Sequence, residues 1–329
     1  MNISLIFIIT HILVTVIVCM LSRKLHFYDI PDPRKIHKEK ILNTMGISIY
    51  ISLSLVIVSL ELSSKIETII VIGFSLVMIG FLDDRKNFKP TTKLILTFFP
   101  IVYLFFNGFI LSDLGEYELL GKLNLGKFGI VFSFLAVGLL MNSFNYADGI
   151  DGLLLSITIS GLYYLNFLVE SESVNRLLDL IILILIISLF FNLLPVKNKF
   201  KSFLGDGGSL FIGFFMSFLL IYLYKYDKIH PSFLIWSCWY PVYDFLYVTI
   251  NRIIKKKKFY IPDQMHFHHF IIRKYKLTQF KALIIISAIN LFTIILGYNS
   301  ALKFGYVFSL GLFFSLFFIL SFIRSFLKN

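Results

Sequence analysis

Long apolar runs, repeated along the whole chain, limit what this sequence can fold into. A helix that spans a membrane needs about 20 mostly apolar residues, whereas barrel strands would alternate between apolar and polar positions. The runs show no such alternation, so they predict helices, which satisfy their own backbone hydrogen bonds in lipid. Eleven runs are apparent, at 3–21, 45–60, 68–82, 94–107, 128–142, 152–168, 177–194, 209–224, 231–250, 282–297 and 304–323. We therefore expect one all-α polytopic membrane domain over residues 1–329, with about eleven spanning helices and ten as the alternative count.

Composition supports the membrane class. The chain is 57% hydrophobic and only 15% charged, whereas soluble domains are about half apolar and a quarter charged. A net charge of +12 would suggest nucleic acid as the partner of a soluble protein. In a membrane protein it indicates basic loops facing anionic lipid head groups, so we expect lipid and no nucleic acid. The two cysteines, Cys19 and Cys238, lie inside apolar runs and imply no disulfide framework.

The lysines and arginines predict the orientation. With the N-terminus outside, 24 of the 31 fall inside, and seven fall outside. This asymmetry follows the positive-inside rule. The inside segments are 22–44, 83–93, 143–151, 195–208, 251–281 and the tail from residue 324. The outside segment 108–127 alternates weakly, which leaves a short hairpin and an interfacial helix open.

Acidic side chains gather on the predicted inside loops. Ionisable groups at a membrane edge are costly, so a cluster of them indicates function. Asp148 and Asp151 lie in a loop with no basic residue, three positions apart, so on a helix end they would share a face. Such a pair repels itself unless a cation or a ligand compensates. For either aspartate alone, a helix N-cap is the structural alternative. The full set is Asp83, Asp84, Asp148, Asp151, Asp206, Asp244 and Asp263.

Two motifs that contain these acids lie at the ends of apolar runs. Asp83-Asp84-Arg85 closes the third run, where a charged helix end is the simpler explanation, and snorkelling would explain Lys93. The segment Gly205-Asp206-Gly-Gly-Ser209 opens a run; its glycines permit a tight turn, and the new helix offers N–H groups to a phosphate. A plain Asp or Ser N-cap is its alternative.

The histidines are the densest cluster of polar groups. His266, His268 and His269 lie within four residues on the most basic inside loop. Histidines donate to phosphate and also bind metals. A structural zinc site is not expected, because no inside loop supplies a cysteine; chance loop histidines are the alternative. Carboxylates that hold magnesium, with lysine and histidine around them, can bind a diphosphate and neutralise charge at the phosphorus under attack.

These residues together resemble the polyprenyl-phosphate N-acetylhexosamine-1-phosphate transferases, glycosyltransferase family 4, which includes the WecA and MraY enzymes. Five motifs appear in the same order on the same side of the membrane, and the His-x-His-His form resembles the WecA-like branch. They are Asp83-Asp84-Arg85 with Lys93, Asn142-x-x-Asn145-x-x-Asp148-Gly-x-Asp151-Gly-Leu153, Phe203-Leu-Gly-Asp206-x-Gly-Ser209, Pro241-x-x-Asp244 with Arg252, and Asp263-x-x-His266-x-His268-His269.

The resemblance implies roles for individual residues. Asp206 would bind Mg²⁺, with Asn145 a candidate second ligand and Mn²⁺ a substitute ion. Asp83 would deprotonate or orient the lipid phosphate beside Asp84, and Lys93 would hold a phosphate. The remaining predicted substrate contacts are Asp151 to the uracil ring, Phe203 stacked on that ring, His266, His268 and His269 on the diphosphate, and Asp148 with its role left open between metal, water and structure.

The implied reaction is attack by polyprenyl (undecaprenyl) phosphate on the sugar-proximal phosphorus of a UDP-N-acetylhexosamine, with UMP leaving. We favour direct displacement over a covalent phospho-aspartate. The resemblance places the enzyme in a prokaryotic inner membrane with its active site facing the cytoplasm, and leaves a homodimer open.

One departure from the family pattern lies in the first inside loop. It keeps Pro31-x-x-Arg34-Lys35-x-His37, but then lacks the expected prolines and double glycine.

Two other classes remain as alternatives. A transporter or flippase should place its polar residues mid-membrane on broken helices, often in two related halves. The acids of this chain instead lie at the predicted inside edge, and no halves are apparent. A non-catalytic relative with a scaffolding role is the second alternative, and the complete carboxylate set argues against it.

Overall fold

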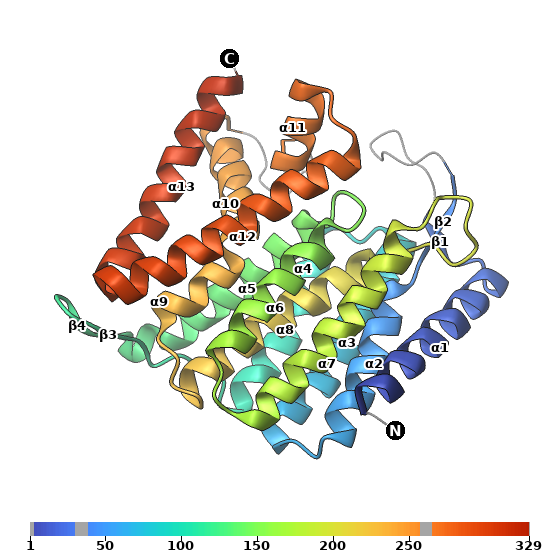
Figure 1. Cartoon of the computed structure of the whole chain (residues 1–329), viewed down its shortest axis with the longest axis horizontal. Coiled ribbons are helices and arrows are strands. Elements are labelled where there is room, and N and C mark those ends of the chain that lie inside the picture. Colours follow the sequence, from blue (N-terminus) through green and yellow to red (C-terminus); the bar gives the residue numbers. More distant parts are fainter. Residues whose placement is uncertain (1–2, 30–38, 257–264, 329) are drawn as a thin grey trace.

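The structure is a computed structural model, described here for residues 3–29, 39–256 and 265–328. It is a bundle of helices that run roughly alongside one another, with two small sheets at the margins (Figure 1). The helices are α1 (Ile3–Lys24), α2 (Met45–Ser59), α3 (Ser64–Lys86), α4 (Pro90–Phe106), α5 (Gly129–Ala147), α6 (Leu153–Leu168), α7 (Glu172–Leu193), α8 (Gly205–Lys225), α9 (Pro231–Leu234), α10 (Trp239–Ile254), α11 (Phe267–Tyr275), α12 (Gln279–Phe304) and α13 (Tyr306–Lys328), with 3-10 turns η1 (Gly126–Phe128) and η2 (Ile235–Cys238).

Every predicted apolar run overlaps a helix of the structure. Within the described part of the chain, seven helices are long and apolar enough to cross a membrane, and α2, α4 and α6 are shorter apolar helices. The number of crossings and their orientation remain predictions. The run 231–250 was expected to be one span, but it is divided into α9, η2 and α10. The helix α11 was not expected at all, because its nine residues carry too little apolar sequence for a span.

The centre of the bundle is α8, which is 83% buried over its most apolar stretch. It packs against α2, α3 and α5. The glycines at its start permit this: a Cβ on Gly80 of α3 would lie 2.1 Å from the backbone nitrogen of Gly207. Only glycine at both positions lets the two backbones approach so closely. The glycine-rich motif therefore seats the start of α8 directly against the end of α3.

The first and last helices occupy opposite outer edges of the bundle (Figure 1). Their apolar stretches are only 22% buried in α1 and 6% buried in α13, as expected of helices that face lipid. Even so, α1 is tied to the core by His11, whose ring nitrogens lie 2.8 Å from Ser52 Oγ and 2.9 Å from Ser188 Oγ.

Two short sheets join segments that are distant in the sequence. The strands β1 (Tyr28–Asp29), β2 (Ile41–Asn43) and β5 (Ser202–Phe203) form one sheet, in which β2 runs parallel to β5 and Asn43 pairs with Phe203. This sheet brings the first inside loop beside the start of α8. The strands β3 (Asp113–Tyr117) and β4 (Gly121–Asn124) form an antiparallel hairpin, so segment 108–127 is a hairpin and not an interfacial helix.

Candidate active site

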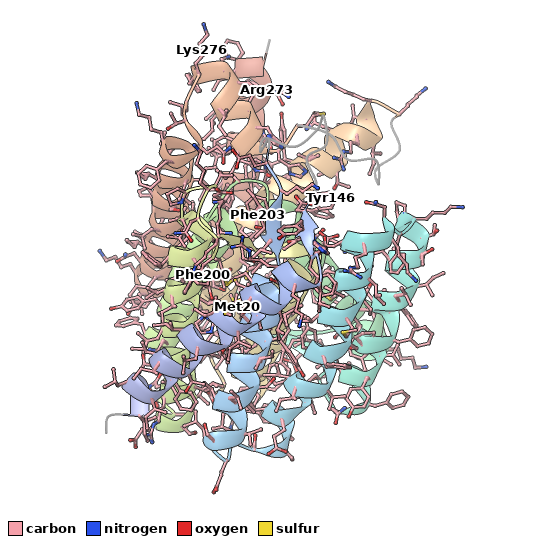
Figure 2. All side chains as sticks on the ribbon, turned by 90° about the vertical axis from the view of Figure 1, so that its right-hand side faces the viewer. Met20, Tyr146, Phe200, Phe203, Arg273 and Lys276 are labelled. Carbon is pink, nitrogen blue, oxygen red and sulfur yellow. The ribbon has the colours of Figure 1, made fainter. Side chains whose placement is uncertain are left out.

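A cavity of about 560 Å³ lies where the β1–β2–β5 sheet meets the ends of α3, α5 and α8. It contains seven of the predicted site residues and six carboxyl-bearing side chains, and no Lys or Arg among the described residues lines it. Figure 2 shows Phe203 and Tyr146 toward the end of the bundle that carries Arg273 and Lys276. The lining residues are Asp29, Glu39, Ile41, Asn43, Asp84, Asn145, Asp148, Gly149, Ile150, Asp151, Asn192, Val196, Phe203, Leu204, Gly205, Asp206, His269 and Gln279.

Asp206 lies at the meeting point of three helices. Lys93 Nζ, from α4, lies 2.5 Å from Asp206 Oδ2 and 2.9 Å from Asp83 Oδ2. Asn145 Nδ2, from α5, donates to Asp206 Oδ1 at 3.0 Å and to Ser209 Oγ at 2.8 Å. One lysine therefore compensates two carboxylates, and Asp206 itself remains part of the cavity lining.

The two adjacent aspartates of α3 have different surroundings. Asp84 lines the cavity and accepts the backbone N–H of Asp206 at 3.1 Å. Asp83 is 8% exposed and lies behind the lining, where its Oδ1 accepts the backbone N–H of Phe88 at 2.8 Å. Gly205 makes this arrangement possible, because its φ is +75° and a Cβ there would lie 2.8 Å from Asp84 Oδ2. The structure therefore exposes Asp84, and not Asp83, to a ligand in the cavity.

Asp148 follows the C-terminal end of α5 and is half-buried in the cavity lining. The helix N-cap considered for it is wrong, because the residue before α6 is Gly152. Burial and the nearby charges of Asp206 and Asp151 raise the pKa of Asp148 from its ordinary value of 3.8 to about 8. A carboxylate with this environment would gain from a bound cation.

The lining fits a magnesium ion that is completed by substrate. Mg²⁺ prefers oxygen ligands and is commonly held by one or two carboxylates together with water and substrate phosphates. Asp206, Asn145, Asp84 and Asp148 bring such donors to one region of the lining. No group of three or more His, Cys, Asp or Glu side chains within the described ranges is arranged as a ready metal cage. The donor set therefore suits an ion that arrives with a phosphate more than a resident structural ion.

Asp151 and Phe203 form another part of the lining, and both were predicted to contact the uracil ring. Asp151 Oδ2 lies 2.7 Å from Lys201 Nζ, and its side chain is 32% exposed whereas that of Lys201 is 2% exposed. Lys201 Nζ also donates to the backbone oxygen of Asn192 at 2.7 Å and lies 5.5 Å from the centre of the Phe203 ring.

The three predicted histidines differ in their position relative to the cavity. His269 lines the cavity, whereas His266 and His268 are 4% and 1% exposed. His268 packs so closely on Gly149 that a Cβ there would lie 2.1 Å from its Nε2. Burial, and then the neighbouring His269, lower the pKa of His268 to about 3, so it is neutral at physiological pH. Only His269 is placed to contact a ligand directly.

His266 is held by a buried ionic network. Its Nδ1 lies 2.9 Å from Asp244 Oδ2, and Asp244 Oδ1 accepts from the backbone N–H of Phe267 and from Arg324 Nη1, each at 2.8 Å. Arg324 comes from the end of α13 and also donates to the backbone oxygen of Met265. Its side chain is 3% exposed. The last helix of the chain thus fixes the start of α11, which carries His268 and His269.

Sequence reasoning missed several of these contributions. Lys201 and Arg324 were counted only as inside positive charges, and Asn192 was counted only as part of an apolar run. Asn192 accepts from the backbone N–H of Gly152 at 2.6 Å and donates to the oxygen of Ser202 at 3.1 Å, so it joins two parts of the lining. Lys201, two residues before Phe203, was the one with a usable signal, because alternate residues of an extended strand share a face.

The bounds of the predicted inside segments need correction. Asp83, Asp84, Lys93, Asn145 and Asp206 were counted in these segments but lie on helices; for Asp83, Asp84, Lys93 and Asp206 this agrees with the run ends at which they were predicted. The hydropathy of a run ends where polar residues begin, whereas the helix continues past that point. Asp263 and the motif at 31–37 lie outside the described residues.

The fold and the site together define a class of protein, namely a helical protein suited to multiple membrane crossings with an acidic cavity at one end of its bundle. Comparison with known proteins agrees. The glycosyl transferase family 4 profile matches residues 66–224, which include Asp83, Lys93, Asp148 and Asp206. Relatives match over most of the chain as well, so the comparisons agree with the family resemblance that the motifs indicate.

Two relatives show how far the similarity extends. The chain is 29% identical over 260 residues to the undecaprenyl-phosphate alpha-N-acetylglucosaminyl 1-phosphate transferase of Escherichia coli (strain K12), covering 77% of this chain and 71% of the relative. It is 25% identical over 298 residues to the transferase of the same name from Thermotoga maritima, covering 89% of this chain and 88% of the relative. The similarity therefore spans most of this chain and most of each relative.

Proposed function

We propose that this protein transfers an N-acetylhexosamine 1-phosphate from a UDP-sugar to polyprenyl phosphate, with release of UMP, at the cytoplasmic face of a bacterial membrane. The observation that carries this proposal is the position of Asp206, where Asp84, Lys93 and Asn145 meet at the cavity lining. The relatives are named as undecaprenyl-phosphate N-acetylglucosaminyl 1-phosphate transferases, which makes UDP-N-acetylglucosamine the first donor to test.

Asp206 and Asn145 are the residues that would hold magnesium, and Mn²⁺ is the natural substitute. The ion supplies charge neutralisation at the donor diphosphate. Lys93 is not part of the cavity lining; it holds Asp206 in place and offsets part of its charge. Asp84 accepts the Asp206 N–H and so fixes the first turn of α8, while His269 faces the cavity and can donate to a phosphate oxygen.

The chemical step is a displacement at phosphorus. An oxygen of the polyprenyl phosphate forms a bond to the sugar-proximal phosphorus, and the bond from that phosphorus to the bridging oxygen of UMP breaks, so that UMP leaves with the electron pair. If the lipid phosphate arrives with one proton, Asp84 is the exposed carboxylate that can accept it, with Asp83 behind it. Positioning and charge neutralisation supply most of the catalysis in such reactions.

The test is UMP release by purified protein in detergent or nanodiscs with undecaprenyl phosphate and Mg²⁺. UDP-N-acetylhexosamines are offered one at a time. We expect release with at least one donor, loss of release with EDTA, and recovery with added Mg²⁺. If folded protein releases no UMP with any donor, the result would contradict the proposal and favour a transporter or a non-catalytic scaffold.

A second measurement separates the two chemical routes. Incubation with the UDP-sugar and Mg²⁺ in the absence of lipid should release no UMP if displacement is direct. A burst of UMP stoichiometric with protein, with phosphosugar bound to an aspartate, would instead show the covalent route.

A further inference from the structure

Lys201 is a buried lysine beside a cavity that otherwise presents acids. Its side chain is 2% exposed and lies behind the lining, whereas its partner Asp151 is 32% exposed and belongs to the lining. The pair therefore presents a carboxylate to the cavity and holds the compensating cation behind it. Any effect of Lys201 on a ligand in the cavity would therefore pass through Asp151.

The contacts of Lys201 connect three separate segments of the lining. Its ammonium donates to Asp151 Oδ2 in the α5–α6 turn and to the backbone oxygen of Asn192 in α7, both at 2.7 Å. It also lies 5.5 Å from the centre of the Phe203 ring in β5. Asn192 in turn binds Gly152 and Ser202. A single cation therefore sets the relative positions of a carboxylate and an aromatic ring.

Lys201 also reduces the negative charge of the cavity lining. The six carboxyl-bearing side chains of the lining would repel an anionic ligand, and the magnesium site proposed above offsets only the charge near Asp206. Lys201 offsets the charge of Asp151, which lies elsewhere in the lining. A carboxylate paired in this way keeps lone pairs to accept an N–H without presenting an uncompensated charge.

We propose that Lys201 is a positioning residue for nucleotide binding: it orients Asp151 to accept a ring N–H and supports the Phe203 ring against which the base stacks. This inference rests on the proposed function, because it assigns the nucleobase of the donor to this part of the cavity. Lys201 itself contacts no substrate.

The test measures binding of UMP, the product, by calorimetry, so it does not depend on turnover. We expect Lys201→Met to weaken UMP binding about 10- to 100-fold, the loss that a charge-assisted hydrogen bond represents. In the transferase assay, KM for the UDP-sugar should rise by a similar factor, while kcat at saturation and KM for polyprenyl phosphate stay within about threefold of wild type. Lys199→Met removes an exposed lysine of the same loop and should bind UMP like wild type.

A double variant is the control for loss of stability in the single variants. Lys201→Met leaves Asp151 without its cation, and Asp151→Asn leaves a buried ammonium, so either single variant could lose stability. Lys201→Met/Asp151→Asn removes both charges together. It should fold and bind UMP no more weakly than the weaker single variant, because both changes interrupt one interaction.

The outcomes are distinguishable. If wild type binds UMP and Lys201→Met binds it equally well, the positioning role is wrong and the proposed function is unaffected. If the losses in the double variant add, Lys201 does not act through Asp151, and the inference also fails. If folded wild type binds no UMP at all, the uridine donor is wrong, and the proposed function fails together with this inference.

Discussion

Two regions of this molecule hold partly buried aspartates, and they differ in how those acids are satisfied. Beside the hairpin, Asp113 accepts from Tyr224 Oη, from Ser112 Oγ at 2.9 Å and from the Gly115 N–H at 3.2 Å. Burial would raise its pKa, but the hydrogen bonds more than offset this and lower the pKa to about 2. In the cavity, burial and two neighbouring acids raise the pKa of Asp148 to about 8.

The difference distinguishes an acid that the chain itself compensates from one that a ligand would compensate. Asp113 has three hydrogen-bond donors and lies 3.3 Å from Lys122 Nζ, so its charge is compensated within the chain. Asp148 lies near the charges of Asp206 and Asp151 and lines an open cavity of about 560 Å³, so a cation or a donor brought by a ligand would stabilise its ionised form. Acid content alone would not have distinguished the two regions. The following experiments test this contrast, from the largest expected effect to the smallest.

Asp206→Asn should have the largest effect. Loss of the carboxylate that would hold magnesium should lower turnover about 10³-fold or more, because a metal ion contributes several kcal/mol at a charged transition state. UMP release under saturating substrates measures it, with size-exclusion behaviour as the check on folding. Asp113→Asn is the matched control, since it makes the same chemical change at the other acid and should keep near wild-type turnover. Full activity in Asp206→Asn would remove the metal assignment.

The sequence predicted the members of this site better than their arrangement. The order of motifs placed Asp84, Asn145, Asp148, Asp151, Phe203, Asp206 and His269 in one site, and all seven line the cavity. It could not show that Asp83 and His266 lie behind the lining, because one residue along a helix changes the direction of a side chain by about 100°. Pairing of β2 with β5 was also out of reach, since it joins Asn43 to Phe203, which are separated in the chain by the six helices α2 to α7.

Arg324→Met should have the next largest effect. It removes the cation that holds Asp244 and the backbone of Met265, so the start of α11 should shift and misplace His269. We expect turnover to fall about 10- to 100-fold, as misplacement of a contacting group by about 1 Å can do. Arg324→Lys should recover only part of this loss, because lysine cannot bond both partners with a planar fork. UMP release measures both variants.

The control for Arg324 is Arg273→Gln, which removes an exposed arginine of α11 itself. It should leave turnover within about twofold of wild type, as expected of a surface charge. If Arg324→Met is folded and equally active, the end of α13 has no part in placing the histidine segment. The ionic network around Asp244 would then have only a structural role, as the hydrogen bonds to Asp113 do.

Tyr224→Phe tests the hairpin region. The change removes the hydroxyl that donates to Asp113, and the free energy of unfolding should fall by about 1–3 kcal/mol, the cost of leaving a buried acceptor with one donor fewer. Thermal melting in detergent should show a midpoint lower by a few degrees. Turnover at a temperature where the variant is folded should equal that of wild type. A drop in turnover without a drop in melting temperature would mean that the hairpin communicates with the cavity.

The last test follows stability instead of turnover and concerns a pair of opposite pH dependences. Asp113 has a folded-state pKa of about 2, below its ordinary 3.8, so its contribution to stability is present above about pH 4 and is lost as the pH falls from 4 to 2. Asp148 has a folded-state pKa of about 8, so the folded protein retains a proton that the unfolded chain has already released. Stability should therefore fall as the pH rises from about 4 to 8.

The difference in melting temperature between wild type and Asp148→Asn, measured in EDTA, isolates the second effect. At about pH 3 Asp148 is protonated in the folded and in the unfolded wild type and resembles asparagine, so the two proteins should melt together, whereas at about pH 8.5 wild type should melt at the lower temperature. Added Mg²⁺ should then raise the wild-type midpoint most at high pH, because a cation favours the ionised carboxylate. A difference that stays constant with pH would mean that Asp148 is already compensated within the chain, as Asp113 is.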